Sequence, residues 1–586
     1  MEHLKNKKFI FLLIILSLIC ANISFGEHVL INSKDWRDVY SGMVYANLNG
    51  DKSNFLTSTK HSTIILGAIS KESDIFLINS RDEPYIKSYR ATILASGYDS
   101  VEDITTRNSN LDLAERLEDI TNFIVIDDSY GYNSISVAAY AVSSRSYVLF
   151  ADEDNIDDVY DFLSEAQVDN LIIFGSVDRD VKTILQEFNP EIINEGDRFD
   201  NNLKIIDKYV EINPDTKQVY LSNGEFIEDS LIAGDDPVIF IGKANVPDQV
   251  REYIKSSQFQ VATLIGNELI GAAQFIKRQI GIPVFVKFAQ GARTPTGTIS
   301  QVEDLDRFPM PQYNLNLGIY EIKYNRATNN LEVTYENFVD LGTYFIPTIT
   351  VSNSDGEEVV LGSEDCIVEE DEDGVLFIDK GSYKTLACGL NIDGEEGLNA
   401  YVYTLFGESR KNMEYVLEGT YNISIITILD DTSIVIKGLV YDESSHEFIV
   451  EIENTGDVDV WVSPEIIDLI FNDDYINYGI EEPIKISAGK SKKISIPVDD
   501  LTPEDIEENE LIRVKAYYGE RETSLFKVSF AEFEFQYKQA SYYMYVIIIV
   551  LILLFILFEF GKKKCPNCKH KNKRRAKRCV KCHHKF

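Results

Sequence analysis

The stretch SYVLFADEDNIDDVYDFLSEAQVDNLIIFGSVDRDVKTILQEF, residues 146–188, alternates two short apolar runs with two amphipathic runs. The apolar runs, YVLF at 147–150 and LIIF at 171–174, have the length and composition of buried strands, and each is followed by apolar residues at helical spacing. The order is therefore β-α-β-α. Continuous apolar strands between helices are typical of a parallel sheet covered on both faces, so this stretch predicts a small α/β layer.

Similar apolar runs recur at Val29–Ile31, Ile124–Ile126 and Val219–Leu221, about 95 residues apart. Self-similarity at a fixed period indicates repeated structural units. The sequence therefore predicts three copies of one α/β module, which we assign to the following ranges: 27–122, 123–215 and 216–293.

In each copy, a glycine follows an apolar run and precedes a predicted helix. These glycines are Gly67, Gly175 and Gly266. We expect each to end the second strand of its module and to allow a tight turn into the next helix. Such a strand edge is also where open α/β sheets bind ligands, so a ligand role is the alternative. The chain has no G-x-G-x-x-G or Walker motif after a strand, and we predict no nucleotide site.

The stretch INEGDRFDNNLKIIDKY, residues 193–209, resembles the Gly-Asp-Arg-Tyr signature of the type 2 cell-wall-binding repeat, with Asp197, Arg198 and Phe199 at the signature positions. Pro237 opens a run similar to the proline-led apolar motif of that family. The first copy keeps only Thr106–Asn108 at the signature. The resemblance implies three modules packed around a pseudo-threefold axis that bind anionic wall polymers without covalent attachment.

Residues 294–312 lie in a proline- and glycine-containing stretch without sustained periodicity, which predicts a linker. Beyond it a second repeat has an offset of 117 residues, in which Asn337 matches Asn454 and Tyr344 matches Trp461. The alternating stretches LEVTYEN and FIVEIEN are typical of half-buried antiparallel strands. We predict two β-sandwiches, at 313–428 and 429–537, which resemble immunoglobulin-like surface domains. Both asparagines are expected to bond turn backbone.

The two ends of the chain predict export and membrane anchoring. Residues 1–26 hold lysines followed by an apolar run, as in a signal peptide, and an uncleaved anchor is the alternative. The apolar run 542–560 would span about 28 Å as a helix, enough to cross a bilayer once. Twelve Lys and Arg residues without acidic partners in 562–586 predict a cytoplasmic tail and an external bulk.

The chain of 586 residues has a formal net charge of −39, and the +12 of the tail leaves −51 on the rest. A surface this acidic repels nucleic acid, which argues against a nucleic-acid-binding ectodomain. It suits solubility or the binding of divalent cations. The overall prediction is a multidomain protein: three α/β parallel-sheet modules, two all-β sandwiches, one transmembrane helix and a small metal-bound tail.

Four cysteines in the tail, Cys565, Cys568, Cys579 and Cys582, form a C-x2-C-x10-C-x2-C frame. Two such knuckles present four thiolates to one zinc ion, so residues 561–586 predict a structural zinc ribbon. A redox dithiol pair is the alternative. The tail resembles short zinc ribbons of archaeal and bacterial membrane proteins, although it has Lys569 and His583 where glycine commonly follows each knuckle, which predicts strained or looser hairpins.

Two external residue sets carry further predictions. Cys366 and Cys388 are a candidate disulfide, and two buried free thiols are the alternative. Asn422 begins an Asn-Ile-Ser sequon and is a candidate glycosylation site, although a lone sequon also arises by chance.

No nucleophile with a base, no spaced histidine metal motif and no G-x-S-x-G elbow stands out, and we predict no enzyme. The resemblance implies a membrane-anchored surface protein that attaches to, or forms part of, the cell envelope or surface layer, with a glycan, wall polymer or neighbouring subunit as partner. A receptor or adhesin that signals to a cytoplasmic partner through the tail is the alternative. A degenerate hydrolase would require a deep pocket near Gly175.

Overall fold

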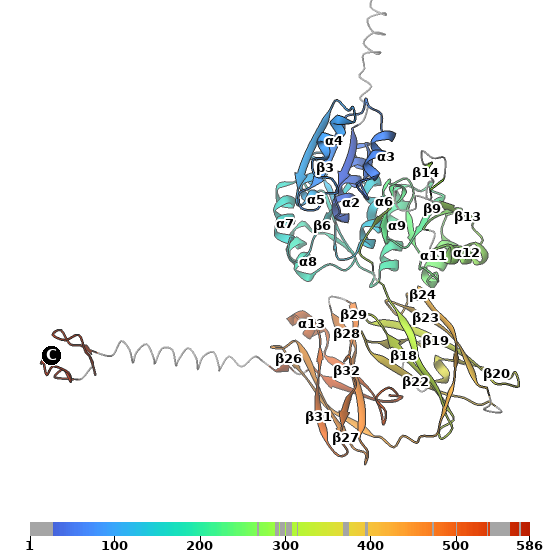
Figure 1. Ribbon diagram of the computed structural model, residues 1–586, viewed down its shortest axis with the longest axis vertical. Coiled ribbons are helices and arrows are strands. Elements are labelled where there is room, and N and C mark those ends of the chain that lie inside the picture. The colour runs from blue at the N-terminus through green and yellow to red at the C-terminus, as the bar shows by residue number, and fades with distance from the viewer. Residues whose placement is uncertain are drawn as a thin grey trace, which may run out of the picture. The chain divides into compact units, whose positions relative to one another are not determined.

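The computed structural model describes most of the chain (Figure 1). The described residues are 27–266, 269–287, 292–293, 299–300, 307–312, 314–366, 374–392, 397–471, 474–499, 501–535, 537–538, 563–573 and 576–586. They form two compact units: the first runs to Asp430 and includes 470–477 and 519–528, and the second holds the remainder.

The first α/β layer is a four-stranded parallel sheet in the order β2-β1-β3-β4. Its strands are β1 (His28–Asn32), β2 (Lys52–Phe55), β3 (Ile75–Ser80) and β4 (Val101–Thr106). Its helices are α2 (Trp36–Asn49), α3 (His61–Ala68), α4 (Tyr89–Ala95) and α5 (Ser109–Ala114). The central strand β1 is buried along its whole length, as the continuous apolar run predicts.

The second layer repeats this order as β6-β5-β7-β8, also parallel. Its strands are β5 (Asn122–Ile126), β6 (Ser146–Phe150), β7 (Asn170–Phe174) and β8 (Glu191–Ile193). Its helices are α6 (Tyr132–Ser143), α7 (Ile156–Glu165), α8 (Arg179–Leu185), the 3-10 turn η1 (Gln186–Phe188) and α9 (Arg198–Ile212). Residues 146–188 thus form the predicted β-α-β-α unit.

The third layer has the order β11-β9-β12-β13, again parallel. Its strands are β9 (Gln218–Ser222), β11 (Val238–Phe240), β12 (Val261–Ile265) and β13 (Val284–Lys287), and the short β10 (Phe226–Ile227) belongs to a separate two-stranded sheet. Its helices are α10 (Asp229–Ile232), α11 (Asp248–Ser256) and α12 (Ile270–Gln279). The three runs used to find the repeat lie in β1, β5 and β9, and one buried hydrophobic cluster extends through all three layers.

The glycine prediction holds for two copies and is wrong for the first. Gly175 directly follows β7 with φ 80°, and Gly266 directly follows β12 with φ 130°. Gly67 instead lies inside helix α3. The apolar run before it was assigned to a strand, but a short apolar run does not distinguish a buried strand from one face of a short helix. Strand β3, eight residues further on, takes the place next to β1.

The linker prediction for 294–312 is wrong over its last residues. β16 (Phe308–Pro309) pairs with β10, and Phe308 and Met310 lie in the core of the α/β layers. A Cβ atom on Gly131 would lie 2.6 Å from Met310 Cβ, so a glycine is needed where the returning chain meets helix α6. Earlier in the segment, β15 (Ile299–Ser300) pairs with β14 (Ala292–Arg293).

The region after residue 314 is antiparallel apart from the terminal strands β25 and β34, and forms two sandwiches. The first pairs β22-β18-β17-β25 with β20-β19-β23-β24 and carries β21 on β19. Its strands are β17 (Leu317–Asn325), β18 (Asn330–Asn337), β19 (Thr343–Ser352), β20 (Glu358–Gly362), β21 (Leu376–Ile378), β22 (Tyr383–Gly389), β23 (Asn399–Gly407), β24 (Tyr415–Asn422) and β25 (Ser424–Ile426).

The second sandwich has the same strand order, with sheets β31-β27-β26-β34 and β29-β28-β32-β33 and β30 on β28. Its strands are β26 (Ile434–Asp442), β27 (Glu447–Asn454), β28 (Val460–Phe471), β29 (Asp474–Tyr478), β30 (Ile484–Ile486), β31 (Ser491–Pro497), β32 (Leu511–Gly519), β33 (Lys527–Glu534) and β34 (Tyr537–Lys538). Thr502 precedes helix α13 (Pro503–Glu508) and caps it, because its side chain accepts a hydrogen bond from Asp505 N–H.

The two sandwiches also share local features at the 117-residue offset. A bulge between Ile319 and Glu321 in β17 recurs between Ile436 and Gly438 in β26. Asn337 and Asn454 are both buried, and each side chain donates to two backbone carbonyls and accepts from the N–H two residues later. The prediction that they bond turn backbone is confirmed.

Two predicted segments, the signal at 1–26 and the transmembrane helix at 542–560, lie outside the described residues. Within the described ranges, no helix combines the length and apolar character that crossing a membrane requires.

Candidate functional site

The four tail cysteines converge on one point, between the hairpin of β35 (Lys563–Lys564) and β36 (Lys571–Asn572) and the turn that follows. All four Sγ atoms lie within 4.8 Å of one another, with Cys565 to Cys582 at 3.5 Å and Cys568 to Cys579 at 3.4 Å. A tetrahedral sulfur site with bonds of about 2.3 Å has edges of about 3.8 Å. The four cysteines are therefore positioned to bind a metal ion.

The two knuckles have the same backbone geometry. Cys565 N–H donates to His570 O at 2.9 Å, and Cys579 N–H donates to His584 O at 2.7 Å. Lys569 and His583 have φ of 56° and 55°, which is the left-handed region that glycine adopts without cost. Both residues thus adopt the backbone conformation that glycine would favour, which is what the strained alternative of the sequence-based prediction requires.

Asn572 links the knuckles and is not among the residues predicted from the sequence. Its side chain is 3% exposed; Nδ2 lies 3.5 Å from Cys579 Sγ, and Oδ1 accepts from Val580 N–H at 2.9 Å. The sequence feature that could have identified Asn572 is an uncharged polar residue among the lysines and arginines of the tail. Amide donors to a ligand sulfur orient it and stabilise its charge.

The thiols differ in acidity. Burial raises the pKa of Cys579, but hydrogen bonds from the backbone of Cys582 and Lys581, from Asn572 and from Cys568 together outweigh it and lower that pKa to about 5. A backbone hydrogen bond at His570 lowers the pKa of Cys568, but the three neighbouring thiols hold its proton and raise that pKa to about 12. Cys579 is therefore the first of these two to supply a thiolate.

The signature residues of the α/β region have structural positions. Asp197 caps helix α9 by accepting from Phe199 N–H at 2.9 Å and Asp200 N–H at 2.8 Å. Phe199 is 1% exposed in the core, and Pro237 leads into β11, where its carbonyl accepts from Tyr220 N–H. These residues fix the start of α9 and the edge of the third sheet.

Arg198 is buried against carboxylates from the β23–β24 loop. Its side chain is 5% exposed, its Nε lies 3.2 Å from Glu408 Oε1, and its terminal nitrogen pairs with Glu414. The guanidinium also lies over the rings of Tyr132 and Phe199. The signature arginine is therefore engaged inside the protein and is not exposed to an external anion.

Two carboxylates face one guanidinium in this cluster, which makes Glu414 hard to ionise. Burial, together with the neighbouring Glu408 and Glu225, raises the pKa of Glu414 to about 8 although Arg198 lowers it. Burial likewise raises the pKa of Glu408. The cluster favours the state in which one carboxyl holds a proton.

The strand edge near Gly175 is filled. A Cβ atom on Gly175 would lie 2.8 Å from Asn133 Nδ2, so the side chain of Asn133 occupies the place where a strand-edge ligand would enter. Gly175 therefore serves the tight turn after β7, which is the first of the two roles predicted for this glycine.

Two asparagines that the sequence patterns did not single out join neighbouring layers. Asn110 Nδ2 donates to Val148 O at 2.8 Å and its Oδ1 accepts from Phe150 N–H at 3.1 Å, both on the edge strand β6. Asn202 makes the same pair with β11, at 2.9 Å each. Each asparagine side chain thus takes the place of the neighbouring strand that an edge strand lacks. The Asn-Leu dipeptide that both positions share is the sequence pattern from which the two residues could have been predicted.

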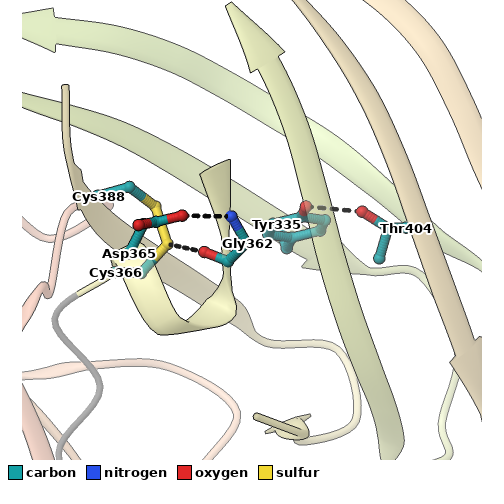
Figure 2. Close-up of a disulfide and its surroundings, with 6 residues drawn as sticks. All are labelled: Tyr335, Gly362, Asp365, Cys366, Cys388 and Thr404. Carbon is teal, nitrogen blue, oxygen red and sulfur yellow. Dashed lines mark hydrogen bonds between the residues drawn. A yellow bond between two sulfur atoms is a disulfide. The ribbon is translucent and has the colours of Figure 1, made fainter. Parts of the chain in front are cut away.

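The first sandwich has a disulfide between Cys366 and Cys388 (Figure 2). Cys366 follows β20 and the 3-10 turn Ser363–Asp365, and Cys388 lies in β22, so the bond joins the two sheets. Nearby, Tyr335 and Thr404 share a hydrogen bond of 2.8 Å across the same interface. Asn422, the candidate glycosylation residue, is exposed at the end of β24.

No protein-family model matches the chain, and no curated protein matches it. Among solved structures, the ligand-binding region of SgrA of Enterococcus faecium matches at 11% identity and a TM-score of 0.14, covering 19% of this chain and 98% of that one. The CsuC-CsuE chaperone-tip adhesion subunit complex of Acinetobacter baumannii matches at 10% identity and a TM-score of 0.15, covering 39% of this chain and 100% of that one. The E. coli chaperone DraB matches at 12% identity and a TM-score of 0.13, covering 39% of this chain and 97% of that one.

Proposed function

We propose that this chain is a membrane-anchored surface protein that attaches to, or forms part of, the cell envelope or surface layer through its three α/β layers. The observation that carries the proposal is the repetition of one parallel strand order in three sheets that share one core. Repeated layers present the same kind of surface several times, which suits a ligand or neighbour that is itself repetitive. The signature and the proline-led motif support the same assignment.

The partner in this proposal is a glycan, a wall polymer held through cations, or a neighbouring subunit. Direct binding of an anionic polymer by Arg198 is disfavoured because that side chain is buried against Glu408 and Glu414. The acidic surface would repel a polyanion unless divalent cations lie between them.

The remaining parts have supporting roles in this proposal. The two sandwiches form a stalk, and the disulfide in the first supports an external location, because such bonds persist in oxidising compartments. The four tail cysteines bind Zn²⁺, which supplies the folding free energy that so small an apolar core lacks.

The experiment is protease treatment of intact cells that express the full chain, followed by sedimentation of the detergent-solubilised full chain with isolated envelopes. We expect protease to remove residues 27–538 while the tail survives, and envelopes to deplete the chain from solution. Repeating the sedimentation with a divalent-cation chelator separates cation-bridged binding from direct binding. A bulk protected in intact cells, or a chain that stays in solution with every envelope fraction, would exclude the proposal.

A receptor role is the second candidate, because the apolar side chain of Val580 on the second knuckle is 75% exposed among the basic residues of the tail. In a receptor, this side chain is the candidate contact for a cytoplasmic partner, because it projects from a turn held by the metal-binding cysteines. Affinity capture on the full chain tests this role: a partner lost with Val580→Ser supports a receptor, and unchanged capture supports anchoring alone.

A further inference from the structure

A groove of about 810 Å³ lies between helix α5 and helix α7. Its floor contains apolar side chains, including Leu117, Ile120, Phe123 and Phe162. Its rim holds six exposed carboxylates: Asp112, Glu115, Glu118, Asp158, Asp161 and Glu165. Among the described residues that line it there is no Lys or Arg. The groove is apolar at the bottom and uniformly negative at the top.

The internal repeat shows what normally occupies this place. Asn110 in α5 and Asn202 in α9 make the same bonds to the next layer and are therefore equivalent. Four residues after Asn110, helix α5 ends at Ala114. Helix α9 passes the matching position, Ile206, and continues for six further residues, which is about 9 Å of helix.

That extra helical segment closes the equivalent space against helix α11. Tyr253 of α11 donates its hydroxyl hydrogen to Asp207 Oδ1 at 2.7 Å. In helix α7, Val159 and Leu163 face the core as Val250 and Ile254 do in α11, which puts Phe162 at the place of Tyr253. Phe162 instead packs edge-on against Phe123, with ring centroids 5.6 Å apart, and lines the open groove. The groove is thus the space that a longer α5 would fill.

We propose that this groove docks a cationic amphipathic helix of a partner protein, two to three turns long. The internal repeat gives the shape of the occupant, because a helical segment fills the matching space beside α11. The floor requires apolar residues at i and i+3 or i+4, and the six carboxylates require Lys or Arg on the flanks. Docking of such a helix covers the half-buried apolar side chains Leu111, Phe162 and Ala166 and balances the negative charge of the rim.

The test uses the full chain and a synthetic fluorescent 11-residue peptide, about three helical turns, with leucines at helical spacing and lysines on the flanks. The comparison peptide has glutamate in place of every lysine. We expect the lysine peptide to bind at least tenfold more tightly than the glutamate peptide, with an affinity that falls as salt rises.

Two variants locate the binding. The triple change Asp158→Asn, Asp161→Asn and Glu165→Gln should weaken binding at least tenfold, whereas the matched control Asp180→Asn, Glu187→Gln and Glu211→Gln, on exposed residues away from the groove, should leave it within twofold. Leu111→Trp should abolish binding by filling the groove while leaving its charge unchanged.

Three results would overturn the proposal: equal binding of the two peptides, equal effects of the groove and control changes, or full binding by Leu111→Trp. Displacement of the peptide by spermine at equal molar concentration would indicate a small polycation site and also count against a helix. Circular dichroism melting of each variant verifies that it is folded.

Discussion

Arg198 in helix α9 donates a buried hydrogen bond to the carboxyl group of Glu414 before strand β24, and the two residues lie 216 positions apart in the sequence. The surrounding backbone supports the contact: Asn245 N–H donates to Glu414 O at 3.2 Å, and Asn245 Nδ2 donates to Met413 O at 2.6 Å. The pair therefore anchors the loop between β23 and β24 to the α/β layers.

Removing the guanidinium should be strongly destabilising, because it leaves two buried carboxyl groups without a counter-charge. We expect Arg198→Met to lower the free energy of unfolding by about 3–5 kcal/mol. Denaturant unfolding of the full chain, followed by fluorescence, measures this.

The matched control is Arg145→Met, which removes an exposed pair with Asp119 and should cost at most about 1 kcal/mol. A triple variant that adds Glu408→Gln and Glu414→Gln to Arg198→Met should recover part of the loss. Equal effects of the two arginine changes would show that the buried pair does not stabilise the fold.

The raised pKa of Glu414 makes stability depend on pH. Since the folded protein holds this proton up to about pH 8 while the unfolded chain releases it near its ordinary value of 4.5, the folded state binds more protons in between. The stabilisation from this carboxyl is complete below about 4.5 and is lost as pH rises toward 8.

The measurement is the free energy of unfolding at pH 5 and at pH 8.5, for the natural chain and for Glu414→Gln. The natural chain should lose more stability than the variant over this interval. A larger loss in the variant would contradict the protonated carboxyl. Glu418→Gln, on the exposed part of β24, is the control.

Asn572→Ala should weaken metal binding without removing a ligand, because its amide contacts Cys579 Sγ and holds the Val580 N–H. Loss of such a supporting group typically reduces metal affinity by about 10- to 100-fold. Competition of the full chain with a chromophoric zinc chelator measures the affinity. Lys573→Ala, at an exposed position one residue away, should change it less than twofold.

Glycine at Lys569 and His583 should stabilise the metal-bound tail, since both residues are held at positive φ. Each replacement should remove about 1 kcal/mol of backbone strain. The readout is the temperature at which the zinc-loaded full chain releases the metal to a dye, which should rise. Lys573→Gly, where φ is not positive, should lower it, and a lower release temperature for the double glycine variant would show that the side chains matter more than the backbone.

The sequence predicted the sandwiches well and the α/β region with one register error. The 117-residue offset placed Asn337 and Asn454 correctly because each asparagine bonds backbone within its own turn and strand neighbourhood. Gly67 was misplaced because the three apolar residues before it fit a helix face and a strand equally well. Phe308 was missed because a two-residue strand leaves no periodic pattern.

The sequence by itself determined the features that depend on local spacing: the repeated layers, the alternating strands and the four-cysteine frame of the tail. Only the tertiary structure decided that Arg198 faces Glu408 and Glu414, that Asn110 and Asn202 bond the next layer, and that a short α5 leaves a groove. The physical reason is that a buried charge or amide is satisfied by whichever group lies within about 3 Å in space. Such a partner has no fixed distance along the chain.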